Sequence, residues 1–236
     1  MEAYNMKNLV ITVARGYGSG GKTIASRVAE DFGIHCYENR ILTLASQVSG
    51  LDKELFAEAN ERLPDNSLLR GLLHGIPHST RPAVRKFRSH DELFAIQRKI
   101  IETLADTESC VIVGKCADHI LRDRPNVVSV YIEAPREFCR AEIMRRMQVS
   151  AEVADRSITD NDTYRAEYYK YYTNGNYWTN PVNYDLTINR ARAGFENSVR
   201  IIEDYVRMKF PDMRFPCDQQ PEVTASDVTE AEEVSQ

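Results

Sequence analysis

The sequence predicts a three-layer α/β fold, in which a parallel sheet carries helices on both faces. Three observations lead to this prediction. Short apolar runs rich in β-branched residues alternate with amphipathic helical segments along most of the 236-residue chain. The first of these runs ends in a glycine-rich turn that leads directly into a helical pattern. With 42% hydrophobic and 28% charged residues, the chain has the composition of a globular protein that buries a sizeable core.

The first strand is predicted at residues 9–14, LVITVA, because a short continuous apolar run is typical of a strand that is buried on both faces. After the glycine-rich turn, Ile24, Val28 and Phe32 follow at helical spacing. Gly33 then provides a C-terminal cap for that helix. Together these residues form a strand, a loop and a helix.

Three further strands are predicted at residues 110–114, 127–132 and 184–188. Helical segments precede or follow these strands, at residues 92–106, 136–147 and 194–210. Strands that alternate with helices predict a parallel sheet with right-handed crossovers.

Two stretches interrupt this alternation and are interpreted as insertions. Residues 60–90 are rich in proline, glycine and basic side chains, for which a solvated surface is favoured over a nucleic-acid contact. Residues 148–183 contain a helical piece, 151–172, followed by a turn-rich segment. The aromatic residues of this second insertion are expected to pack on one another rather than to stack on a base. Insertions above the strand ends of an α/β sheet are where lids and substrate clamps lie.

The negative charge of the chain is concentrated at its end. Residues 212–236 hold seven of the 35 acids and one of the 30 bases, which leaves 28 acids and 29 bases for residues 1–211. The body is therefore close to neutral, and no nucleic-acid partner is predicted. Aliphatic residues become sparse after residue 211, so we expect one domain over residues 1–211 and a disordered acidic tail over 212–236.

Neither a membrane segment nor a metal-binding cysteine pattern is found in the sequence. No apolar run reaches about 18 residues, and the first residues lack the basic start and cleavage site of a secretory signal. The five cysteines form no CxxC pair, so we expect them to be reduced. These features predict a cytoplasmic protein with no membrane partner.

Residues 16–23, GYGSGGKT, match the phosphate-binding pattern GxxxxGK[ST] in full. Glycines allow successive backbone N–H groups to turn inward around an anion, and the N-terminus of the following helix adds its dipole. We expect Lys22 to bridge the β- and γ-phosphates of ATP and the Thr23 hydroxyl to hold Mg²⁺. The residues expected to bind ATP in this loop are Gly16, Gly18, Ser19, Gly20, Gly21, Lys22 and Thr23.

The loop alone does not decide where the phosphoryl group goes. A GTPase would show an aspartate at the end of a hydrophobic strand and a base-reading NKxD sequence. Here the strand at 110–114 is followed by Lys115, and the sequence contains no NKxD. This favours a kinase that acts on a small molecule.

A resemblance to a known family is carried by four segments: ITVARGYGSGGKTIASRVAEDFGIHCYENRIL, VIVGKCADHILRDRPNVVSVYIEAP, RAEYYKYYT and NPVNYDLTINRARAGFE. Together they resemble the cytidylate-kinase-like family, a bacterial branch of the nucleoside monophosphate kinases. The resemblance implies a core of about five parallel strands, an acceptor-binding segment at about residues 35–100 and a LID at about residues 148–183. It also implies Mg²⁺-dependent transfer of a phosphoryl group from ATP to a nucleoside monophosphate, with CMP or dCMP as the leading acceptor.

The resemblance further implies roles for single residues. The acceptor is expected to contact Tyr37, Glu38, Arg40, Lys115, Asp118 and Asp162. Cations that hold charge on the migrating group are expected among Lys22, Arg140, Arg145 and Arg165. Additional ATP contacts are expected from Arg156, Arg190 and Ala191. Lys115 occupies the position where related proteins usually carry arginine. Lysine keeps the positive charge but cannot form the two parallel hydrogen bonds that a guanidinium makes to a phosphate.

Two alternatives remain open at this point. The chain could be a P-loop kinase of another small metabolite, or a nucleotide-binding regulatory module with weak catalysis. The lysine at position 115 and the acidic tail speak for the second alternative. The sequence fixes neither the acceptor base, nor the choice between ribose and deoxyribose, nor the oligomeric state.

Overall fold

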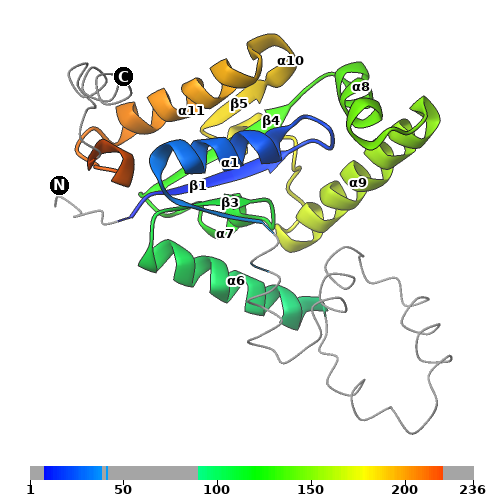
Figure 1. The fold of residues 1–236 in the computed structure, drawn as a ribbon. Coiled ribbons are helices and arrows are strands. Elements are labelled where there is room, and N and C mark those ends of the chain that lie inside the picture. Colours follow the sequence, from blue (N-terminus) through cyan, green and yellow to red (C-terminus); the bar gives the residue numbers. More distant parts are fainter. Residues whose placement is uncertain (1–7, 39–40, 42–89, 220–236) are drawn as a thin grey trace, which may run out of the picture.

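A five-stranded parallel sheet forms the centre of the molecule (Figure 1). The computed structural model describes residues 8–38, 41 and 90–219. The strand order is β2-β3-β1-β4-β5, so the first strand of the chain lies in the middle. The strands are β1 (Val10–Arg15), β2 (His35–Tyr37), β3 (Cys110–Val113), β4 (Val127–Glu133) and β5 (Leu186–Asn189). The predicted parallel sheet is confirmed.

Helices cover both faces of the sheet and its carboxyl edge (Figure 1). On one face lie α1 (Gly21–Phe32) and α11 (Phe195–Lys209), and on the other lie α6 (His90–Thr107) and α7 (Ala117–Ile120). Beyond the strand ends lie α8 (Arg136–Met147) and α9 (Ala151–Tyr172), and the short α10 (Arg190–Ala193) follows β5. Two 3₁₀ turns, η2 (Pro181–Asn183) and η3 (Pro216–Gln219), complete the described elements.

The core has two halves because successive strand residues face opposite sides of the sheet. Ile11 and Val13 of β1 pack toward α1 and α11, whereas Val10 packs with the cluster under α6. All three side chains are almost fully buried. This arrangement explains why β1 reads as a continuous apolar run, and the two covered faces confirm the predicted three-layer fold.

Local structure differs from the sequence-based expectations at two places. The residue pattern gave no strand at β2, because the strand has three residues and His35 is exposed. Residues 212–219, assigned to the tail, contain η3, and Phe215 is 1% exposed with its ring centroid 4.4 Å from that of Phe32. The described domain therefore extends to residue 219, and the rest of the tail lies outside the described residues.

The two insertions are described to different extents. The helical piece expected at 151–172 is α9, which Ser150 caps by accepting a hydrogen bond from the backbone N–H of Val153. The proline-rich stretch at 60–90, like most of the acceptor-binding segment at 35–100, lies outside the described residues. Among the helices that the structure describes, none has the length and apolarity needed to span a membrane.

Candidate active site

The phosphate-binding loop joins β1 to α1 at the carboxyl edge of the sheet. Gly18 and Gly20 adopt left-handed backbone angles, with φ of +84° and +82°, which glycine reaches without a steric cost. The Ser19 hydroxyl donates a hydrogen bond to the Gly16 carbonyl at 2.9 Å, and the Gly21 N–H contacts the same hydroxyl oxygen at 3.4 Å. The loop therefore turns tightly into the N-terminus of α1, as an anion-binding loop requires.

Two predicted ligands stand on the first turn of α1. The Lys22 ammonium forms an ion pair with Glu38, which follows β2. The side chain of Lys22 is 58% exposed, and Thr23 beside it is also exposed. Both groups are thus reachable by a nucleotide that enters from solvent.

A cavity of about 440 Å³ opens next to this loop. Four of the residues that the sequence associated with the acceptor or with catalysis line it: Glu38, Lys115, Asp118 and Arg165. The aromatic side chains of Tyr164, Tyr168, Tyr169 and Trp178 form much of its wall. The structure therefore brings together residues that lie up to 127 positions apart in the chain, from Glu38 to Arg165.

Asp118 is the buried acid of this cavity. The residue is 6% exposed, and its carboxylate accepts a hydrogen bond from the Tyr169 hydroxyl at 2.7 Å. Burial raises the pKa of Asp118 to about 6, although the bond from Tyr169 favours the charged form. The carboxylate is therefore ionised at neutral pH and can accept hydrogen bonds from a ligand.

The turn before Asp118 holds an unusual backbone conformation. Lys115 and Cys116 have φ of 62° and 54°, which costs roughly 1 kcal/mol or more for each non-glycine residue. The Gln97 side-chain amide, which is fully buried, donates hydrogen bonds to the Lys115 carbonyl at 3.3 Å and to the Tyr168 hydroxyl at 3.1 Å. Strain of this kind, held in place by buried contacts, is typical of binding sites.

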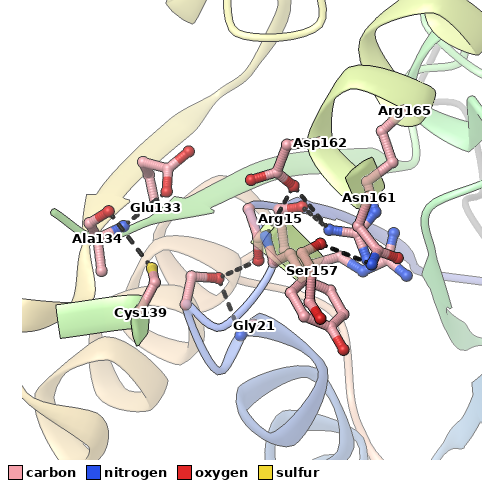
Figure 2. A network of polar contacts seen from close by, with 12 residues as sticks. Arg15, Gly21, Glu133, Ala134, Cys139, Ser157, Asn161, Asp162 and Arg165 are labelled. Carbon is pink, nitrogen blue, oxygen red and sulfur yellow. Dashed lines mark hydrogen bonds and ion pairs between the residues drawn. The ribbon is translucent and has the colours of Figure 1, made fainter. Parts of the chain in front are cut away.

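Arg165 and Asp162 of α9 attach this helix to the phosphate loop. Asp162 accepts a hydrogen bond from the Tyr17 N–H at 2.9 Å and another from Arg165 at 3.1 Å. The same Arg165 nitrogen donates to the Arg15 carbonyl at 3.2 Å. Figure 2 shows Arg15, Asp162 and Arg165 gathered where α9 meets the end of β1. Asp162 does not line the cavity, and it accepts hydrogen bonds from the loop and from Arg165 of its own helix.

Arg190 lies on the other side of the loop. Its guanidinium carbon is 4.9 Å from the centre of the Phe138 ring, and its Nη1 is 3.7 Å from Glu142. A methyl group on Gly20 would approach the Arg190 Nε to 2.9 Å, so the side chain lies directly on the loop. Its neighbour Ala191 is exposed on α10.

The remaining predicted residues lie away from the cavity. On α8, Arg140 pairs with Asp155 at 3.1 Å and Arg145 pairs with Glu142 at 3.3 Å. The Tyr37 hydroxyl donates a hydrogen bond to Glu108 at 2.7 Å. Arg156 is exposed on α9, and Arg40 lies outside the described residues.

Two charged residues near the loop were missed by the sequence reasoning. Arg15, the last residue of β1, lines the cavity with a side chain that is 19% exposed. Glu133, the last residue of β4, accepts hydrogen bonds from the Tyr131 hydroxyl and from the Ala134 N–H, and its carboxylate lies against Gly16. Their positions at the ends of the two central strands were the available signal, because parallel strands end at a common edge.

A central strand that runs into a complete GxxxxGKT loop, with a charged cavity beside it, defines a P-loop kinase. Residues 10–192 match the Cytidylate kinase-like family, and the chain belongs to this family. A protein described as cytidylate kinase, from Methanopyrus kandleri, is 23% identical over 208 residues, which span 83% of this chain and 92% of that protein.

A solved structure supports the fold independently. The crystal structure of an uncharacterized protein from Eubacterium ventriosum superposes with a TM-score of 0.62 at 22% identity. The superposition covers 84% of this chain and 98% of that one. The two proteins therefore share their architecture.

Proposed function

We propose that this protein transfers the γ-phosphoryl group of ATP to a nucleoside monophosphate, and that CMP or dCMP is the preferred acceptor. The observation that carries the proposal is the cavity beside the phosphate loop. It combines cations (Arg15, Lys115 and Arg165) with the buried acid Asp118 and an aromatic wall. A nucleoside monophosphate has the matching parts: an anionic phosphate, a polar base edge and a flat ring. Membership of the family supports the same class of acceptor.

The loop and α1 would hold the donor nucleotide. The backbone N–H groups of the loop and the Lys22 ammonium would surround the β- and γ-phosphates. Mg²⁺ that arrives with ATP would neutralise charge on these phosphates, and the Thr23 hydroxyl would be its ligand from the protein. Among the described residues, no group of three His, Cys, Asp or Glu side chains is suited to hold a metal.

The cavity would hold the acceptor in line with the donor. An oxygen of the acceptor phosphate attacks the γ-phosphorus, the bond from this phosphorus to the bridging oxygen breaks, and ADP leaves with that electron pair. Arg165 and Lys22 would stabilise the charge spread over the migrating group. The ionised Asp118 would accept a hydrogen bond from an exocyclic amino group of the base, which favours cytosine over uracil.

The LID at residues 148–183 would close over the two substrates. Its helix α9 already contacts the loop through Asp162, at the Tyr17 N–H. Closure would exclude water, which suppresses hydrolysis of ATP and strengthens the contacts between cations and phosphates.

The test is a coupled assay of ADP release with Mg-ATP and each of CMP, dCMP, UMP, AMP, GMP and dTMP. Turnover on one or two pyrimidine monophosphates supports the proposal, provided that Lys22→Ala lowers it by about 100-fold or more. Arg200→Gln, which removes one charge from the exposed face of α11, serves as the control and should retain activity. If none of the six acceptors supports ADP release although ATP binds tightly, the protein is instead a kinase of another metabolite or a nucleotide-binding regulator.

A further inference from the structure

We propose that Arg15, with Arg165 beside it, binds the phosphate group of the acceptor. The acceptor is then a phosphorylated molecule and not a neutral alcohol. This inference rests on the proposed function and names a binding residue that the sequence did not indicate. It is carried by the position of the Arg15 guanidinium, which lines the cavity and makes no hydrogen bond within the described parts of the chain.

Arg15 has five hydrogen-bond donors and little to donate them to. Within the described parts of the chain its guanidinium makes no hydrogen bond, and its nearest carboxylate oxygen, on Glu38, is 3.8 Å away. The side chain is nevertheless only 19% exposed. The guanidinium faces the cavity, so its donors are available to a ligand that brings several oxygen acceptors.

The two acids that raise the pKa of Arg15, Glu38 and Asp162, are both shared with another cation, and Asp162 pairs with Arg165 at 3.1 Å. Glu38 is shared, because it also forms the ion pair with Lys22. Burial, and next the neighbouring charge of Arg165, lower the pKa of Arg15 to about 10. Two other acids line the cavity, but Asp118 is engaged by Tyr169 and Asp160 lies on an exposed part of α9.

Two glycines keep a slot open for this side chain. A methyl group on Gly114 would come within 2.5 Å of the Arg15 Nη1, and one on Gly21 would come within 2.6 Å of the Arg15 Cβ. Any larger residue at either position would displace the arginine. The space beside Gly21 and Gly114 is therefore filled by the Arg15 side chain, whose ion-pair partner Glu38 is shared with Lys22.

The position and shape of the group select a phosphate. The planar fork of a guanidinium matches two oxygens of a phosphate or a carboxylate, and the second guanidinium nearby, on Arg165, favours the doubly charged phosphate. Arg15 is followed at once by Gly16, so an anion bound to it lies at the same strand end as the γ-phosphate of ATP. A neutral alcohol would offer nothing to this pair of cations.

The experiment measures phosphate binding while the donor site is filled. The protein is saturated with Mg-AMPPNP, and inorganic phosphate is titrated by calorimetry or ³¹P NMR against wild type, Arg15→Gln and Arg200→Gln. We expect Arg15→Gln to weaken phosphate binding by about tenfold or more, while AMPPNP affinity changes by less than about twofold. Arg200→Gln, the matched loss of one surface charge, should leave both affinities unchanged.

Three outcomes would overturn the inference: no phosphate binding by the wild type, unchanged phosphate binding in Arg15→Gln, or an equal loss of AMPPNP binding in that variant. If Arg15→Gln does not fold, Arg15→Lys replaces it, and about a threefold loss of phosphate affinity is expected because the fork is gone. Equal affinity in Arg15→Lys would then contradict the inference. Because the titration needs no turnover, its result does not depend on whether the protein acts on CMP.

Discussion

At the scale of single residues, Glu38 contacts both Lys22 and Arg15. Its carboxylate pairs with Lys22, which belongs to the donor site, and lies 3.8 Å from Arg15 at the acceptor side. A negative side chain thus occupies positions that phosphates would take. Under the proposed function, both substrates would displace the same carboxylate, and Glu38 would oppose their binding.

We therefore predict that Glu38→Gln tightens the binding of Mg-AMPPNP by about threefold to fivefold. This change in affinity corresponds to the free energy of one partly exposed ion pair. Titration with a fluorescent nucleotide analogue measures this change. Asp31→Asn removes a comparable pair with Arg27 on the outer face of α1 and should have no effect. Weaker nucleotide binding in Glu38→Gln would mean that Glu38 positions Lys22 for the nucleotide rather than competing for it.

Asp118 makes the stability of the protein depend on pH. Its pKa is raised from 3.8 to about 6 by burial, so between these values the folded chain keeps a proton that the unfolded chain has lost. The stability that this proton contributes is full below pH 3.8 and is lost as the pH rises through about 6.

The variant Asp118→Asn cannot ionise, and its amide oxygen can still accept the bond from Tyr169. Relative to wild type, we expect the variant to gain up to about 3 kcal/mol of unfolding free energy between about pH 4 and about pH 7.5. Urea unfolding at both pH values measures the difference. The exposed Asp123→Asn should show no such trend, and a flat difference for Asp118→Asn would refute the raised pKa.

At the scale of elements, the turn from β1 into α1 depends on Gly20 in two ways. Its positive φ disfavours other residues, and its missing side chain makes room for Arg190. Gly175 separates these two effects, because it has φ of +94° while no described atom lies within 4 Å of an added methyl group.

We predict that Gly20→Ala and Gly175→Ala both lower the unfolding free energy by roughly 1 kcal/mol through the backbone alone. Only Gly20→Ala should also weaken the binding of Mg-AMPPNP, by about fivefold, because it displaces the Arg190 guanidinium from the loop. Denaturant titration and nucleotide binding give the two readouts. Equal nucleotide affinity in both variants would exclude a role for Arg190 at the loop.

Helix α9 shows what periodicity reveals and what it leaves out. Its bounds, 151–172, could be predicted from its own residues and from the cap at Ser150. Its packing could not, because its aromatic residues find partners in other elements. Tyr172 stacks on Phe94 of α6 with ring centroids 3.8 Å apart, so the aromatics do not form a separate core of the LID.

At the scale of the whole molecule, the sequence was sufficient for the layers of the fold and for part of the site. Local patterns located four strands and the phosphate loop, since both signals lie within short segments. The resemblance indicated Lys115, Asp118 and Arg165, which the fold then brings to one cavity. Arg15 escaped notice although it ends a central strand, because its position in the cavity also depends on the strands placed beside it.

The segment after α11 closes one end of the core. Phe215 packs on Phe32, and the Arg207 guanidinium lies 5.5 Å and 5.7 Å from the centres of the two rings. The Phe215 N–H also donates to Asp218 at 2.8 Å. These contacts fix residues 211–219 against α1.

A chain that ends at residue 211 should therefore lose about 3 kcal/mol or more of unfolding free energy, as for a buried phenylalanine replaced by alanine. A chain that ends at residue 219 keeps every described contact and serves as its control. Phe215→Ala in the full chain should lower the unfolding free energy by a similar amount to the truncation at residue 211. Equal stability of the two truncated chains, measured by urea unfolding, would contradict this account.

The central place of β1 has a consequence for how the protein is made. Val10 pairs with Cys110 on one side and with Val127 on the other, so β1 has no neighbour in the sheet until β3, which begins 95 positions after β1 ends at Arg15. On the ribosome, the N-terminal strand must wait for β3 and β4 to be synthesised before it can join a sheet. The phosphate loop, which is translated before β3 and β4, is thus one of the later parts of the protein to acquire its working shape.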